Sequence, residues 1–383
     1  MTLLSQGFRP FFLGAALWAA AAIALWIAIL FTGMLPPSGF PPLLWHIHAM
    51  LFGFVPAAVA GFLLTAIPNW TGRPPVRGAL LGLLVELWVI GRIASFVSAD
   101  IPPWLAIIAD AAFLFALAGV IARELISSGN RRNFVLIAPV MVLAVANVMM
   151  DLTLAGYPSL AGDGWRLGLV ATLILVSVIG GRIVPAFTRN WLMARKTTAV
   201  PPPPGMLDRA SLGVLHAALI VWVFVPDARF TGVALLSGGA LNLWRLARWR
   251  AAATRAEPLL LVLHIGYGWL TLGVTFLGLT VIEPTLPSSA AIHALTVGAI
   301  GTMILAVMTR VTRGHTGHEL SADTMTTSIY LLIFLAAAAR IAAEFAGQWY
   351  ERLLLAAAAA WIGAFGLFVL RYAPLLLRPR RQG

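Results

Sequence analysis

Histidine is the residue type with the clearest chemical potential in this sequence. The chain has seven histidines and no cysteine. His46 and His48 open one apolar segment, His293 opens another, and His315 follows the segment that His293 opens. His264 lies inside a further apolar segment. Because no thiolate is available, imidazole is the expected ligand for haem iron or copper.

The spacing of these histidines predicts more than one centre. Successive residues of an α-helix are about 100° apart, so the rings of His46 and His48 point about 200° apart and do not readily chelate one ion. We expect either two centres on opposite sides of this helix, or one metal ligand and one supporting side chain. His315 lies 22 residues beyond His293, about 33 Å along a helix. These two therefore serve different sites, and His264 is the best-placed partner for His315.

The other two histidines are weaker metal candidates. A lone helical histidine such as His216 most often only makes a hydrogen bond to a neighbouring helix. His318 follows two glycines, Gly314 and Gly317, which favour a loop over a helix around His315. A solvated cytoplasmic turn is the alternative interpretation for both His315 and His318.

Charged residues inside the apolar segments form a second group of candidates. Pairing between helices is the simplest interpretation of Glu86, Arg92 and Asp110. The alternative is a proton path that uses Glu86 and Asp110. Arg182 and Arg310 could meet haem propionates, because the planar guanidinium group suits a carboxylate.

The composition predicts the elements that carry these residues. Of 383 residues, 60% are hydrophobic and 10% are charged, against about 45–50% and about 25% in soluble domains. Apolar runs of about 20 residues recur along the chain, which indicates an all-α, polytopic membrane bundle of about twelve transmembrane helices. The first run is too long for a signal peptide. The expected spans are 11–32, 45–67, 78–98, 103–125, 133–155, 165–187, 210–226, 230–248, 257–281, 289–311, 325–346 and 351–373.

The short connections predict the topology. Basic residues gather before the first span and after every second span, whereas the other connections hold few basic residues and several acids. Basic connections face the cytoplasm, so both termini are expected there, in the inner membrane of a bacterium. The net charge of +12 is thus explained without a nucleic-acid partner. Examples are Arg73, Arg77, Arg131 and Arg132 on the cytoplasmic side and Asp100, Asp163, Asp227 and Glu283 on the other.

We expect a single integral membrane domain over residues 1–383. A proline-rich cytoplasmic connector near 195–209 cannot be helical at its prolines and reads as a stiff spacer. A weak internal echo is also present. Alignment of His48 with His293 superimposes Ala49, Gly53, Thr71 and Gly72 on Ala294, Gly298, Thr316 and Gly317 without a gap. A similar echo in the sixth span suggests three four-helix repeats, with chance similarity between apolar helices as the alternative.

The sequence resembles the NnrS family of bacterial inner-membrane proteins along its whole length. The resemblance implies a twelve-span protein with b-type haem and copper, associated with denitrification and with resistance to nitric oxide and nitrosative stress. The implied ligands are His46, His48, His264, His293 and His315. The layout is also similar to that of haem–copper oxidases and nitric oxide reductases. The matching stretches are GlyPheArgProPhePheLeu (7–13), TrpHisIleHisAlaMetLeuPheGlyPhe (45–54), GlyPheLeuLeuThrAlaIleProAsnTrpThrGly (61–72), GlyGlyArgIleValProAlaPheThrArgAsnTrp (180–191), LeuHisIleGlyTyrGlyTrpLeu (263–270) and residues 293–317.

Two residues depart from the family pattern. The family commonly has glutamate after the second histidine of its HxH motif, where this chain has Ala49. An activity that needs this glutamate as a proton donor or ligand would be altered here. The position of His318 is usually not histidine, which weakens it as a ligand.

The functional prediction is a haem- and copper-binding membrane protein that handles nitric oxide. It either binds nitric oxide or reduces it as a nitric oxide reductase-like oxidoreductase, with an electron donor that the sequence does not name. The competing hypotheses are a transporter or metal-handling permease, and a non-catalytic haem sensor. The chain has no glycine-rich phosphate loop, no HExxH and no serine-nucleophile elbow.

Overall fold

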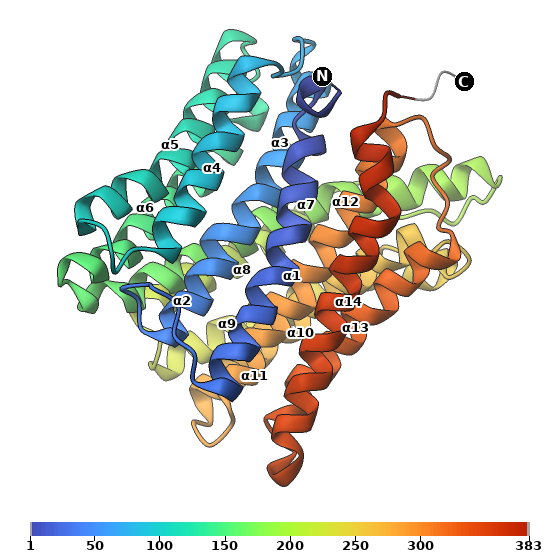
Figure 1. The fold of residues 1–383 in the computed structure, drawn as a ribbon. Coiled ribbons are helices and arrows are strands. Elements are labelled where there is room, and N and C mark those ends of the chain that lie inside the picture. The colour runs from blue at the N-terminus through green and yellow to red at the C-terminus, as the bar shows by residue number, and fades with distance from the viewer. Residues whose placement is uncertain (1, 381–383) are drawn as a thin grey trace. The chain divides into compact units, whose positions relative to one another are not determined.

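Long apolar helices make up most of the chain. The computed structural model describes residues 2–380, and within that range the regular elements are all helical, which confirms the all-α prediction (Figure 1). The helices are α1 (Phe8–Thr32), α2 (Pro42–His48), α3 (Val55–Thr71), α4 (Ala79–Phe96), α5 (Pro103–Ser127), α6 (Ile137–Asp151), α7 (Ala161–Ala194), α8 (Met206–Phe224), α9 (Arg229–Ala247), α10 (Pro258–Ile282), α11 (Ser288–His293), α12 (Thr302–His315), α13 (Thr324–Ala343) and α14 (Tyr350–Leu377).

The helices are those of a multi-pass membrane protein. Among the described residues, eleven helical segments are long and apolar enough to cross a membrane. The expected eighth span corresponds to α9, which is not one of the eleven. Its polar residues, among them Asn242 and the buried Arg245, lower its hydropathy. Neighbouring helices compensate for this, since Asn242 donates to the carbonyl of Ser211 in α8 and Arg245 donates to the hydroxyl of Tyr267 in α10.

One local prediction is wrong. The segment around His315 is not a loop, because α12 continues through Gly314 and ends at His315. A helical glycine costs about 1 kcal/mol, which is less than the loss of backbone hydrogen bonds in a bilayer. The chain leaves the helix at Gly317, whose φ is +80°. His318 lies in the turn that follows.

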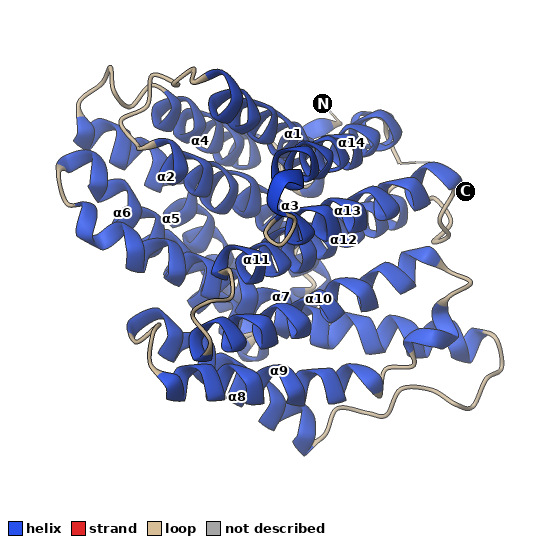
Figure 2. Ribbon diagram, turned by 90° about the horizontal axis from the view of Figure 1, so that it is seen from below, coloured by secondary structure: helices blue, strands red, loops and turns tan. Residues whose placement is uncertain are grey.

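The chain forms two compact units. The first holds Met1–Thr172, Met308–Glu319 and Phe365–Gly383, and the second holds Leu173–Val307 and Leu320–Ala364. Within the first unit, α4, α5 and α6 lie side by side (Figure 1). Within the second, α8 packs on α9 and α9 on α10 (Figure 2). Small residues permit the last contact: a Cβ on Gly278 would lie 2.8 Å from the carbonyl oxygen of Gly232.

Two π-helical segments interrupt the membrane helices at equivalent places. One is Ala49–Phe54, directly after His48, and the other is Ala294–Gly301, directly after His293. These are the histidines that the sequence echo aligns. The helices that follow both end near a Thr-Gly pair, with Gly72 and Gly317 at φ of +69° and +80°. Two members of the echo thus share a backbone pattern, whereas α7, with the third, is an uninterrupted α-helix. The threefold repeat stays a prediction.

Two tryptophans hold the first π-helical segment. The indole N–H of Trp18 donates to the carbonyl of Ala49 at 2.7 Å, and that of Trp88 donates to the carbonyl of Gly53 at 2.9 Å. The wider turn leaves some backbone carbonyls unmatched inside the helix, and the indoles satisfy two of them. Position 53 requires glycine, since a Cβ there would lie 2.5 Å from Trp18 Nε1.

The proline-rich connector is tied to the helix before it. Residues 195–205 contain no helix. The guanidinium group of Arg189, near the end of α7, donates to the carbonyls of Pro201 and Pro202, each at 2.9 Å. Prolines have no N–H to donate, but their carbonyls remain acceptors. The connector therefore leaves α7 in a defined direction.

Candidate metal centre

Two aromatic side chains flank the imidazole of His48 at the end of α2. Its side chain is fully buried. The ring of Phe40 stacks on the imidazole with centroids 5.0 Å apart, and the ring of Phe52 lies 5.6 Å away on a tilted plane. Aromatic rings exclude water but offer no strong acceptor to the ring nitrogens. The polar partners of His48 must therefore come from other helices of the first unit.

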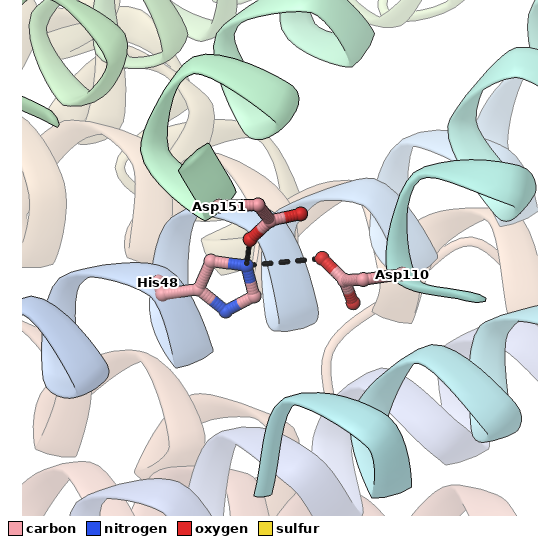
Figure 3. Close-up of side chains that lie close together, drawn as sticks. All are labelled: His48, Asp110 and Asp151. Carbon is pink, nitrogen blue, oxygen red and sulfur yellow. Dashed lines mark hydrogen bonds and ion pairs between the residues drawn. The ribbon is translucent and has the colours of Figure 1, made fainter. Parts of the chain in front are cut away.

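Two aspartates supply those partners. Nε2 of His48 lies 3.0 Å from Oδ2 of Asp110 in α5 and 3.0 Å from Oδ1 of Asp151 at the end of α6 (Figure 3). Both carboxylates are almost completely buried. Nε2 carries at most one hydrogen, so it cannot direct a full hydrogen bond at both carboxylates at once. Three atoms that attract a cation thus converge on one point.

Helix α4 adds a positive charge and a hydroxyl group. The Arg92 guanidinium donates to Oδ1 of Asp110, as a buried ion pair. Ser95 Oγ lies 3.2 Å from Nδ1 of His48. Asn147, one turn before Asp151 in α6, donates from Nδ2 to Oδ2 of Asp110 at 2.8 Å. The interpretation of Arg92 and Asp110 as a structural pair is confirmed, but Asp110 also reaches the histidine.

Several polar atoms around His48 have no hydrogen-bond partner in the described part of the chain. Oδ2 of Asp151 and Oδ1 of Asn147 are buried and have no hydrogen-bond partner among the described residues, and the same is true of Nε and Nη1 of Arg92. A buried unsatisfied oxygen costs about 1–3 kcal/mol. Such a cost persists in native structures mainly where a ligand or a function compensates for it. The two unmatched oxygens belong to the residue types that bind cations.

The backbones of α4 and α5 approach each other closely beside Asp110. A Cβ on Gly91 of α4 would lie 2.9 Å from Oδ1 of Asp110 and 3.2 Å from its Cα. We expect Gly91→Ala to push Asp110 away from His48 and to destabilise the protein by about 1–3 kcal/mol. Thermal unfolding in detergent measures this.

The matched control is Gly119→Ala on α5, where a Cβ would meet nothing within 4 Å. It should be neutral or stabilising by about 0.5–1 kcal/mol, as expected for alanine in a helix. Equal destabilisation by both variants would contradict the role assigned to Gly91.

His46 has surroundings of its own. Its ring stacks on Trp26 of α1, with centroids 4.6 Å apart and an interplanar angle of 15°. The carboxylates that meet His48 belong to α5 and α6. The two histidines of the HxH motif therefore face different helices, which confirms the prediction from their spacing.

His293 is held in the form that metal ligands adopt. Its Nδ1–H donates to the carbonyl of Ser289 at 2.7 Å, so the lone pair is on Nε2. Ser289 Oγ donates to Oε1 of Glu344 at 2.8 Å, and Arg340 donates to Glu344 at 2.6 Å. An arginine–carboxylate ion pair thus lies near His293, as one lies near His48. The carboxylate of Glu344 contacts Ser289, whereas that of Asp110 contacts the histidine itself.

The remaining histidines differ in how fully their nitrogens are used. In buried His264, Nδ1 lies 3.0 Å from the Leu260 carbonyl and Nε2 3.2 Å from the Trp249 carbonyl. A neutral imidazole has one N–H and donates to only one of these carbonyls. The Trp249 carbonyl lies beside Nε2, whereas no such group is found beside Nε2 of His293 among the described residues. His216 Nε2 lies 2.7 Å from Ser177 Oγ, as expected for a structural histidine.

His315 and His318 lie at the other end of the histidine-bearing span. The ring of His315 packs 5.6 Å from that of Phe8, and His318 Nδ1 lies 3.0 Å from Thr316 Oγ1. His315 is half-buried and belongs to the first unit, whereas His264 belongs to the second. Their pairing stays a prediction.

The other charged candidates differ in exposure. Glu86 is exposed on α4, Arg182 is exposed on α7, and Arg310 is half-buried on α12. Asp151 and Asn147 were missed by the sequence reasoning. Their position in the sequence could have indicated them, because both lie towards the same end of a predicted span as His48 and Asp110 do.

Comparison with known proteins adds the family. A family model described as NnrS protein matches residues 2–380. The chain belongs to the NnrS family. No curated protein matches it by sequence. NnrS membership supports a multi-pass membrane protein of the nitric oxide response.

The structure gives a physical reason for one stretch of the NnrS resemblance. In GlyPheArgPro, the guanidinium of Arg9 donates to the carbonyls of Leu376 and Arg378, each at 2.7 Å. Arg9 thereby satisfies carbonyls at the end of α14 that have no partner within that helix. Phe8 packs on His315. This NnrS motif therefore joins the N-terminal helix to the C-terminal one, beside a candidate ligand.

Proposed function

We propose that this protein binds b-type haem and copper and handles nitric oxide in the bacterial inner membrane, with both termini in the cytoplasm. The family membership supports the link to nitric oxide. The absence of cysteine requires haem to be held without covalent attachment. Copper must likewise be held by imidazole or another ligand that is not a thiolate.

The observation that carries the haem proposal is the state of His293. Its Nδ1–H is donated to its own helix, and no hydrogen bond to Nε2 is found among the described residues. A proximal histidine of a haem protein needs this arrangement, because the hydrogen bond fixes the ring and leaves Nε2 for iron. The residues present therefore fit a haem-holding histidine at this position.

The other histidines divide by the same criterion. His315 has no hydrogen bond to its ring among the described residues and is the second haem candidate, with copper as the alternative. His46 offers an imidazole stacked on Trp26. His48 does not suit haem, because carboxylates and a serine surround both of its nitrogens.

Haem, when bound, would supply reversible binding of nitric oxide and, with electrons and protons, its reduction. His293 would hold the haem, and the carbonyl of Ser289 keeps that histidine oriented. Of the two residues suggested for a proton path, Asp110 is buried beside His48, whereas Glu86 is exposed on α4. Reduction additionally requires an electron donor from outside the chain.

The test compares two histidine variants of the full chain. We expect His293→Ala to lose most of its haem absorption, because alanine offers iron no ligand. His216→Ala should keep it, since that histidine already bonds to Ser177. Visible spectra of protein purified from haem-replete cells measure the difference, and anaerobic consumption of nitric oxide with a reductant then separates an enzyme from a binder. Full haem content in His293→Ala would remove His293 from the proposal.

A further inference from the structure

The atoms around His48 have the spacing of donors in a metal's coordination sphere. His48 Nε2 and one oxygen each of Asp110 and Asp151 lie within 4.8 Å of one another. Each carboxylate oxygen is 3.0 Å from the nitrogen. Imidazole and carboxylate bind borderline divalent ions at about 2.0–2.2 Å, so two such donors on one ion lie roughly 3–3.5 Å apart. The observed separation falls in that range.

The neighbours complete a ligand environment. Ser95 Oγ can accept the Nδ1–H of His48 at 3.2 Å, which leaves the lone pair on Nε2, as in metal-bound histidines. Two further oxygens, Oδ2 of Asp151 and Oδ1 of Asn147, are buried without partners. Both side chains are more than nine-tenths buried. Hydrogen-bond donors or a cation could satisfy them. Nε and Nη1 of Arg92 also lack partners among the described residues, so the nearby guanidinium does not satisfy these oxygens in the structure.

Arg92 orients one of the carboxylates. Its guanidinium pairs with Oδ1 of Asp110 and Asn147 donates to Oδ2, so this carboxylate is held on both sides. Ligating carboxylates commonly have such supporting hydrogen bonds. The rings of Phe40 and Phe52 close the site to water.

We propose that His48, Asp110 and Asp151 bind one divalent transition-metal ion, with Asn147 as an additional oxygen donor. One imidazole with carboxylate and amide oxygens suits iron(II), manganese(II) or zinc(II) and does not suit soft copper(I). This site is separate from haem and needs neither haem nor nitric oxide. It places a carboxylate-held metal ion beside the HxH motif, where Ala49 supplies no carboxylate.

The experiment uses manganese(II) as the probe. Full-length protein is treated with a chelator, incubated with manganese(II), freed of excess ion and analysed for metal by mass spectrometry. We expect about one bound manganese per chain and, in pulsed electron paramagnetic resonance, a coupling to one imidazole nitrogen. Asp151→Asn should weaken manganese binding by more than about tenfold.

The matched control is Asp163→Asn. Asp163 is an exposed carboxylate of the same unit, paired with Arg166 outside the cluster, and its loss should leave manganese binding unchanged. Manganese-free wild-type protein after loading, or manganese without nitrogen coupling, would overturn the proposal. Both of these measurements use the wild-type protein, so they do not depend on whether a variant folds. The metal site does not require haem. Haem-free protein that binds manganese would therefore support this proposal, and the haem proposal is tested separately by the visible spectra.

Discussion

Replacement of Asp110 by asparagine is expected to lower the free energy of unfolding by about 3–5 kcal/mol. The aspartate is the common partner of His48, Arg92 and Asn147. Its loss leaves the guanidinium of Arg92, itself nine-tenths buried, without a counter-charge. Removal of one partner from a buried ion pair costs more than the pair itself contributes, because the remaining charge stays desolvated. Reversible unfolding in mixed detergent micelles measures the change.

The control is Asp100→Asn, which removes an exposed carboxylate from the connection between α4 and α5. It should change the free energy of unfolding by less than about 0.5 kcal/mol. The double variant Asp110→Asn with Arg92→Met should recover part of the loss, since both buried charges are then removed. If Asp110→Asn changed the free energy of unfolding as little as the control does, the buried cluster would not contribute to stability.

The second large effect is expected at Arg245, in the second unit. Its guanidinium donates to Oδ1 of Asp208 at 2.8 Å and to the Tyr267 hydroxyl at 2.7 Å, and Tyr267 donates to Asn242. We expect Arg245→Leu to destabilise the protein by about 2–4 kcal/mol, because it leaves Asp208 with only the longer ion pair to Arg248, at 3.8 Å, and leaves the phenol oxygen without its donor. The same unfolding measurement applies.

A double variant tests the reason for this effect. Arg245→Leu combined with Asp208→Asn should be more stable than Arg245→Leu alone, as it removes the carboxylate that has lost its close partner. The surface variant Arg229→Leu, at the exposed start of α9, is the matched control. A double variant less stable than Arg245→Leu would show that packing, and not charge, explains the loss. The network also explains how α9 is stable although it is the least apolar of the long helices.

Hydropathy predicted the helices well because a bilayer leaves the backbone few alternatives. The ends were less accurate. α12 passes through Gly314 to His315, since internal hydrogen bonds outweigh the low helix propensity of glycine. The π-helical segments could not be predicted, because tryptophans from other helices hold the first of them. The echo that aligns His48 with His293 nevertheless marked where both begin.

The candidate sites were predicted in part. The opposite directions of His46 and His48 follow from helical geometry alone, and both rings lie as expected. The junction of His48 with Asp151 depends on how α2, α5 and α6 pack, and one sequence does not determine that packing. His264 stays a predicted ligand, although both of its nitrogens lie near backbone carbonyls that only the fold brings close.

The most direct test of the proposed function is the visible spectrum of the intact chain. Protein purified in detergent from haem-replete cells should show a Soret band and a pyridine haemochrome of the b type, and the ferrous form should change its spectrum on anaerobic addition of nitric oxide. Colourless protein without haem, folded and monodisperse, would contradict the account and would favour a transporter instead.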